Sequence, residues 1–343
     1  NAASAATKTI TLDNAAPTIT IDATLEGDNI VNIDEDATVV ISGTTANVED
    51  AQTVTVTFSD GTTTISKTAS VSSNAFALEV GQLADITNLN DGPITVTASV
   101  SDAHGNAAAT ASRTITLDNL APQVSIDATL EVDNIVNNAE EASVVVTGTS
   151  AGAAGRTVTV TATDINGLTD SGTATIATDG TYSVTLDVNA LADGNLTITA
   201  DVSDLAGNAA AQASKTITLD DTAPTVTIDD TLEGDNKVNA SEDGDVVVSG
   251  SSSGLAAGST VSVTLADSSS TVSTTATVLS SGAWVAEPAD ISALTDGNIT
   301  VTANASDTAG NAASAATKTI TLDTVAPTPT IGTVAVDDVI DVT

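Results

Sequence analysis

One stretch of sequence returns at a nearly fixed interval and constrains the fold more than any other feature. Its copies run over residues 102–122, 204–224 and 307–327, and each joins an Asp-x-x-Gly-Asn turn to an alternating Thr-Ile-Thr-Leu-Asp run that leads into Ala-Pro. The terminal aspartates of this run and of an incomplete first copy are 105, 102 and 103 residues apart: Asp13, Asp118, Asp220 and Asp323. A period near 100 residues is too long for a solenoid repeat and corresponds to one small all-β domain.

This period predicts how the chain is divided. We expect three repeats, at residues 17–121, 122–223 and 224–326. Residues 1–16 are predicted to be the last strand of a preceding repeat, because their sequence recurs near the end of the third repeat. Residues 327–343 are predicted to start a following repeat, so that the chain is a slice of a longer protein.

Alternating apolar and polar residues predict the strands of each repeat. In the first repeat they mark seven segments, namely 17–22, 38–43, 53–59, 63–69, 75–80, 94–102 and 109–118. This count and spacing are typical of an immunoglobulin-like β-sandwich. The fold class predicted is therefore all-β, with tandem seven-stranded sandwiches arranged as an elongated rod. One aromatic residue recurs on the fifth strand, as Phe76, Tyr182 and Trp284, and is expected in the core.

The charge of the chain excludes several classes of partner. Lys and Arg number 7 against 45 Asp and Glu, giving a net charge of -38. Phosphate backbones and anionic membrane surfaces both require basic contacts, so neither nucleic acid nor a membrane surface is an expected partner. No run of about 18 apolar residues is present, so no membrane insertion is expected. With no cysteine and only 1% aromatic residues, a bound metal is the favoured additional stabiliser of such small cores.

The repeated turn and the end of the last strand indicate where that metal would bind. In such a sandwich they lie at opposite poles, so carboxylates of consecutive repeats should converge at each joint. We expect Asp204 and Asn208 to face Asp118, Asp307 and Asn311 to face Asp220 and Asp221, and Asp102 and Asn106 to face Asp13. Ca²⁺, which takes six to eight oxygen ligands, suits this chemistry better than Mg²⁺. The alternative is a set of solvated turns on an acidic, soluble surface.

A second acidic motif lies in the loop after the first strand of each repeat. Its sequence is Leu-Glu-x-Asp-Asn at residues 25–29, 130–134 and 232–236. The candidate ligands are Asp28, Asn29, Asp133, Asn134 and Asp235. This loop could hold an ion of its own or share the ion of the joint, and the sequence leaves both possibilities open.

Enzymatic activity is not expected. The single histidine, His104, corresponds to Ala206 and Ala309 in the other repeats, and we expect it in a solvent-exposed turn. No repeated Ser-His-Asp set, glycine-rich phosphate loop or zinc signature is present.

Together, the Thr-Ile-Thr-Leu-Asp-x-x-Ala-Pro segment, the Asp-x-x-Gly-Asn turn and the period resemble the bacterial immunoglobulin-like (BIg) tandem repeats of giant, type I secreted, RTX-type adhesins and biofilm-associated proteins of Gram-negative bacteria. The resemblance implies a monomeric, secreted stalk at the cell surface, which carries a distal binding domain for cell adhesion or biofilm formation. It also implies calcium at the joints, where eight residues match the interdomain metal pattern: Asp102, Asn106, Asp118, Asp204, Asn208, Asp220, Asp307 and Asn311.

Two other functions stay open from the sequence. The Thr-x-Thr arrays at residues 53–57 and 157–161 are compatible with a face that binds glycan or ice directly. An accessory or surface-layer module is the third possibility.

Overall fold

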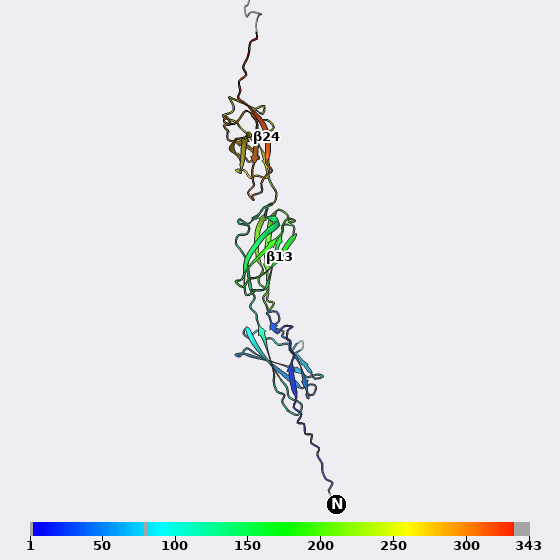
Figure 1. Cartoon of the computed structure of the whole chain (residues 1–343). Coiled ribbons are helices and arrows are strands. Elements are labelled where there is room, and N and C mark those ends of the chain that lie inside the picture. Colours follow the sequence, from blue (N-terminus) through cyan, green and yellow to red (C-terminus); the bar gives the residue numbers. More distant parts are fainter. Residues whose placement is uncertain (1–2, 79–80, 333–343) are drawn as a thin grey trace, which may run out of the picture.

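The computed structural model describes residues 3–78 and 81–332, which form three β-sandwiches in succession along an elongated chain (Figure 1). The predicted fold class, an all-β rod of tandem sandwiches, is confirmed. Residues 3–17 precede the first sandwich and belong to no strand, and Ile10 and Leu12 are 82% and 86% exposed. Of the segment predicted to start a following repeat, residues 333–343 lie outside the described residues.

Each sandwich repeats the same order of strands. The first contains β1 (Thr18–Ile21), β2 (Ile30–Val31), β3 (Ser42–Ala46), β4 (Thr53–Ser59), β5 (Thr64–Ser70), β6 (Ala75–Ala77), β7 (Gly92–Ser99) and β8 (Ala111–Leu117). The second contains β9 (Gln123–Ile126), β10 (Ile135–Val136), the 3₁₀ turn η1 (Glu141–Ser143), β11 (Val144–Ala151), β12 (Thr157–Thr163), β13 (Thr169–Thr175), β14 (Thr181–Leu186), β15 (Gly194–Asp201) and β16 (Ala213–Leu219). The third contains β17 (Thr225–Ile228), β18 (Lys237–Asn239), β19 (Ser249–Ser253), β20 (Thr260–Ala266), β21 (Thr271–Val278), β22 (Ala283–Ala286), β23 (Gly297–Asn304) and β24 (Ala316–Asp323).

The strands of a sandwich form two layers, as β1-β3-β6 and β2-β8-β7-β4-β5 show in the first. In the third sandwich β21 also pairs with β22, which joins both layers into one eight-stranded sheet. Besides the seven predicted strands, each sandwich has a short strand, β2, β10 or β18, that pairs in parallel with the last one. This short strand lies in a segment that the sequence indicates as a polar loop. Because the short strand runs parallel to the last strand, the residues that follow it in the first two sandwiches lie at the pole that faces the next sandwich.

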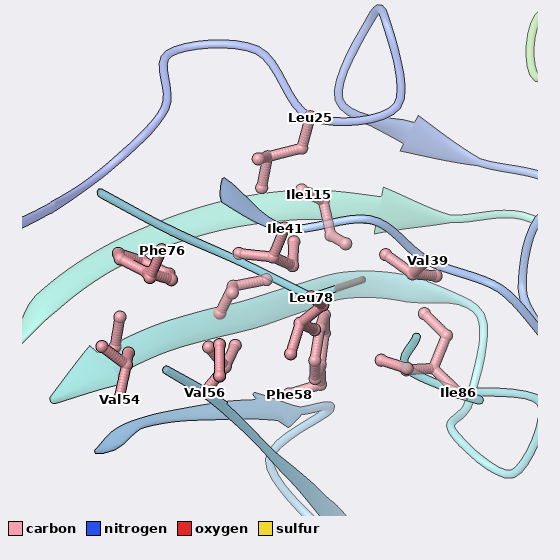
Figure 2. Close-up of a cluster of buried hydrophobic side chains, with 14 of the residues drawn as sticks. Leu25, Val39, Ile41, Val54, Val56, Phe58, Phe76, Leu78, Ile86 and Ile115 are labelled. Carbon is pink, nitrogen blue, oxygen red and sulfur yellow. The ribbon is translucent and has the colours of Figure 1, made fainter. Parts of the chain in front are cut away.

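Each sandwich encloses its own core. Alternation along β4 turns Val54, Val56 and Phe58 inward, all at 0% exposure, and Figure 2 shows them packed together with residues of the facing layer. The recurrent aromatic residue is buried in every sandwich, as predicted: Phe76, Tyr182 and Trp284 are 3%, 4% and 0% exposed.

Each of these aromatic rings packs over a glycine of the neighbouring strand. The pairs across the strands are Gly43 with Phe76, Gly148 with Tyr182, and Gly250 with Trp284. The Tyr182 hydroxyl donates to the Ser125 carbonyl at 2.7 Å, and the Trp284 Nε1–H to the Ser251 carbonyl at 3.1 Å. A Cβ added at any of the three glycines would lie 2.5–2.6 Å from an atom of the aromatic side chain, so only a glycine leaves room there.

No helix among the described residues is long and apolar enough to cross a membrane.

Candidate metal centre

The Asp-x-x-Gly-Asn turn is closed by its own aspartate. In the second sandwich Asp204 is 4% exposed; its Oδ1 accepts the Asn208 backbone N–H at 2.9 Å, and its Oδ2 accepts Asn208 Nδ2 at 3.0 Å. Gly207 provides the φ of 97° that the turn requires. The same pair of hydrogen bonds joins Asp307 to Asn311 in the third sandwich. The turn thus holds the asparagine amide in one fixed orientation.

That amide spans the joint between the first and second sandwiches. Asn208 Nδ2 donates to the backbone carbonyl of Asp118 at 2.8 Å, and Asn208 Oδ1 accepts the Ile33 N–H at 3.0 Å. Asn32 of the first sandwich donates through Nδ2 to the Ala206 carbonyl at 3.0 Å. Three hydrogen bonds therefore connect the two sandwiches directly.

The second joint repeats this arrangement. Asn311 Nδ2 donates to the Asp220 carbonyl at 2.7 Å, Asn311 Oδ1 accepts the Asn138 N–H at 2.9 Å, and Asn137 Nδ2 donates to the Ala309 carbonyl at 3.1 Å. We call these three bonds, and their counterparts at the first joint, the asparagine clasp.

Sequence reasoning placed Asp118, Asp220, Asn208 and Asn311 at the joints but missed the second asparagine of the clasp. That residue belongs to a recurring Asn-x-x-Glu motif: Asn32 to Glu35, Asn137 to Glu140 and Asn239 to Glu242. In each copy the glutamate Oε2 accepts the asparagine N–H, and the asparagine Oδ1 accepts a backbone N–H two residues on. This is the pattern of a capping box. Its occurrence in all three repeats is the sequence signal from which the second asparagine could have been predicted.

Carboxylates from two sandwiches meet at the second joint. Burial, the carboxylate of Asp307 across the joint and that of Asp193 raise the pKa of Asp220 above its ordinary value. Burial and the facing carboxyl group of Asp221 likewise raise the pKa of Glu141. The Asp221 N–H donates to Asp193 Oδ1 at 3.0 Å, which keeps these acids together. Raised pKa values mean that negative charge at this joint lacks sufficient compensation.

Among the described residues the ion pairs are those of His104 with Asp13 and Glu49, so no cationic side chain of the protein pairs with the acids of the second joint. Glu141 Oε2 is buried without a hydrogen-bond partner. At the first joint the equivalent positions hold Asp36, which is 6% exposed, and Asn119, whose Oδ1 is also buried without a partner and whose Nδ2 donates to Asp36. Hard oxygen donors in excess, some of them unpartnered, fit a divalent cation such as Ca²⁺.

The predicted candidates in the loop after the first strand lie elsewhere. Asp28, Asp133 and Asp235 each accept a backbone N–H two residues ahead, while Asn29 and Asn134 accept one four residues back. These bonds stay inside the loop. A cation of the same sandwich also reaches it: Arg113 donates to Asn29 Oδ1 at 3.4 Å, and Lys215 and Lys318 donate to backbone carbonyls at the equivalent place. The structure therefore groups the loop residues apart from the joint residues.

The turn of the first sandwich, which faces the segment before it, keeps only part of the pattern. Asn106 Nδ2 donates to the Asp13 carbonyl at 3.3 Å and to Asp102 Oδ2 at 2.7 Å. Although burial acts in the opposite direction, the hydrogen bonds from Asn106 and from the His104 N–H hold the pKa of Asp102 below its ordinary value. The three residues predicted for this joint are thus brought together, with the side chain of His104 beside them.

Comparisons with known proteins identify the modules. The profile of the bacterial Ig-like domain family (Big_13) matches residues 125–221 and 224–324. No curated protein matches the chain. Bacterial Ig-like domains of this type are structural and non-enzymatic.

Several solved structures are similar. One is a Ca²⁺-stabilised adhesin with which an Antarctic bacterium reaches out and binds ice, at 32% identity over 91% of this chain and 75% of that chain, with a TM-score of 0.50. Another is a tetra-tandem repeat from the extending region of a large adhesion protein, at 32% identity over 89% and 74%, with a TM-score of 0.30. A third comes from a 1.5-MDa bacterial ice-binding adhesin, at 26% identity over 91% and 100%, with a TM-score of 0.42. With its two profile matches and its relatives among adhesin repeats, the chain belongs to the bacterial Ig-like domain family.

Proposed function

We propose that this chain is an extender segment of a large adhesin at the bacterial cell surface, whose joints are stiffened by Ca²⁺ so that a distal binding domain is held away from the cell. The observation that carries this proposal is the convergence of carboxylates from two sandwiches at one joint, where the pKa of Asp220 is raised by burial and by Asp307. The relatives from adhesin repeats support the same role. A monomer outside the cell, exported by a type I route, is part of this proposal.

The ligands proposed at each joint come from both sandwiches. They are Asp118 and Asp204 at the first joint and Asp220, Asp307 and Glu141 at the second, with Asn208 and Asn311 orienting the turn and Asp13, Asp102 and Asn106 at the equivalent place before the first sandwich. Asp28, Asn29, Asp133, Asn134 and Asp235 form a separate, second proposed group inside each sandwich. Calcium sites of extracellular modules have dissociation constants of about 0.1–1 mM, so millimolar calcium outside the cell would fill them.

Chelation tests this proposal. Small-angle scattering in 5 mM Ca²⁺ should give a rod whose sandwiches span about 120 Å, at about 3.3 Å per strand residue plus loops. EDTA should broaden the distance distribution, because the uncompensated acids repel. At calcium about tenfold above the dissociation constant, each site adds about 1.4 kcal/mol to the free energy of unfolding, or several degrees of melting temperature. An identical scattering profile and melting curve in EDTA would refute the calcium-stiffened stalk.

Glu141→Gln should stabilise the calcium-free protein and weaken its calcium affinity. The amide can donate to Asp221 where the carboxylate repels it, and a hydrogen bond to a charged group is worth about 1.5–3 kcal/mol. Differential scanning calorimetry in EDTA and calcium titration measure the two effects. Asp179→Asn is the matched control, since it removes the same charge from an exposed turn of the second sandwich and keeps an acceptor for the Thr181 N–H. Should Asp133→Asn weaken calcium binding while Glu141→Gln leaves it unchanged, the ion belongs to the loop.

The same groups set an expected pH dependence. Since the pKa values of Glu141 and Asp220 are raised, the folded state binds protons more tightly than the unfolded chain. In EDTA the free energy of unfolding should therefore rise as the pH falls from neutral through those raised values, until the ordinary value of about 4 is reached. With calcium bound the free energy of unfolding should instead decrease as the pH falls, because protons compete with the ion. Melting curves recorded between pH 7.5 and 5, in EDTA and in calcium, distinguish an increase in stability from a decrease.

A further inference from the structure

The pole of the first sandwich that faces the preceding segment carries two side chains that the other two sandwiches lack at the equivalent places. His104 corresponds to Ala206 and Ala309, and Glu49 corresponds to Ala153 and Ala256. The two residues are 55 positions apart in the sequence, yet both stand in the same sandwich and both are replaced by alanine in the other two. Because both differences fall in one sandwich, we expect the two side chains to act together, and the short distance between them supports this.

Three potential ligand atoms gather at this place. His104 Nδ1 lies 3.2 Å from Asp13 Oδ2 and 3.8 Å from Glu49 Oε1. All three atoms are within 4.8 Å of one another, and they are the group of this kind found among residues 3–78 and 81–332. Each residue comes from a different segment: the chain before the first sandwich, the loop before β4 and the turn before β8.

The other oxygen of each carboxylate is already held. Asp13 Oδ1 accepts the Ala15 N–H at 2.9 Å, and Glu49 Oε2 accepts the Ala103 N–H at 2.8 Å. The His104 N–H donates to Asp102 Oδ1 at 2.9 Å, which fixes the backbone that carries the imidazole. The two free carboxylate oxygens and the ring nitrogen are therefore turned toward one another by bonds to the backbone.

We infer that Asp13, Glu49 and His104 form a binding site for a divalent transition metal of the Zn²⁺ class. An imidazole nitrogen suits such ions, whereas Ca²⁺ prefers oxygen ligands alone. Ligand atoms at about 2.0–2.2 Å from a tetrahedral zinc ion stand about 3.3–3.6 Å apart. The distances of 3.2 Å and 3.8 Å from His104 Nδ1 to the two carboxylate oxygens need little adjustment to reach this value. The side chains are 28% to 46% exposed, which leaves room for water at the remaining position.

Such a metal would tie the segment before the first sandwich to that sandwich through coordinate bonds. The other two joints, with alanine at the equivalent positions, have no nitrogen ligand to offer. The site shares Asp13 with the calcium ligands proposed before the first sandwich, but it requires neither Asp118 nor Asp220, so it does not depend on calcium at the two joints between the sandwiches.

The single histidine makes the test direct, because only one imidazole contributes to the spectrum of the whole chain. Long-range ¹H–¹⁵N spectra of the 343-residue chain in 5 mM Ca²⁺, titrated with ZnCl₂, should shift the Nδ1 resonance and saturate at one equivalent. Glu49→Gln should weaken this binding tenfold or more. Asp50→Asn is the matched control: it removes the same charge one residue away, where the carboxylate accepts only the Ser73 N–H, and should leave zinc binding unchanged.

Three results would overturn the inference. One is an imidazole that responds to pH but not to zinc, which would leave only an ion pair. Another is equal zinc affinity in His104→Ala and the unchanged chain. The last is displacement of zinc by millimolar calcium, which would make this an ordinary calcium joint. The imidazole signal is separate from the scattering profile, so this inference and the stalk proposal can fail independently.

Discussion

Gly250→Ala should destabilise the third sandwich by about 3 kcal/mol, at the upper end of the cost of overpacking a core. A Cβ at this position would lie 1.9 Å from the Thr227 carbonyl oxygen and 2.5 Å from Trp284 Cζ2. Both contacts are far inside van der Waals separation, and one of them is to backbone. Either β17 must leave β19 or the indole must abandon its place against the strand.

The measurement is made simple by Trp284, the only tryptophan of the chain. Its fluorescence during urea unfolding reports the third sandwich alone. Gly244→Ala is the matched control, because a Cβ there meets nothing within 4 Å and its φ is not positive. The control should be neutral or more stable by about 0.4–1 kcal/mol, through a less flexible unfolded chain. Equal midpoints for the two variants would show that the ring does not depend on the glycine.

The architecture of this chain could be predicted from its sequence because the same signals occur three times. Alternation in segments such as TVTVTFS, followed by a turn at regular spacing, leaves few folds other than a sandwich. The recurrent aromatic residue was placed correctly in the core by its register alone. The glycine beneath it was not foreseen, because a glycine in a strand also marks bulges and bends.

The joints were predicted only in part. The position of Asn208 beside Asp118 follows from the poles of a sandwich. Asn32 was missed because the parallel strand β2 has only two residues, too few to show alternation, and it shifts the loop so that Asn32 rather than Asn29 reaches the next sandwich. Glu141 could not have been found either, since its neighbour Asp221 is 80 residues away in sequence.

His104 shows a different limit of sequence reasoning. The expectation of an exposed turn is correct, since its side chain is 46% exposed. Its two acidic neighbours come from other segments, and no local pattern connects them. A single copy of a feature carries little weight in a repetitive sequence, although here the departure from the repeat is the informative part.

Asn311→Ala should open the second joint while the sandwiches stay folded. The amide has a partner on each side: it donates to the Asp220 carbonyl and accepts the Asn138 N–H, and it also donates to Asp307. Asn311 is 4% exposed, so water replaces these bonds poorly. Each buried group left unpaired costs about 1–3 kcal/mol, and two or three are orphaned here. The decrease in the free energy of unfolding should exceed the contribution of a single calcium ion, which is about 1.4 kcal/mol.

Amide hydrogen exchange can separate the clasp from the ion. The Asn138 N–H donates to Asn311 Oδ1, so its protection from exchange reports the second joint. The Ile33 N–H donates to Asn208 Oδ1 and reports the first joint in the same sample. Asn311→Ala should accelerate exchange at Asn138 at least tenfold and leave Ile33 unaffected; Asn298→Ala, an exposed asparagine of the same sandwich, should change neither. EDTA should accelerate both amides in the unchanged chain, because the carboxylates beside each clasp then repel. If Asn138 stays protected in Asn311→Ala, the sandwiches are held in line by something other than the asparagine. If EDTA leaves both amides protected, the hydrogen bonds suffice and the acids need no ion.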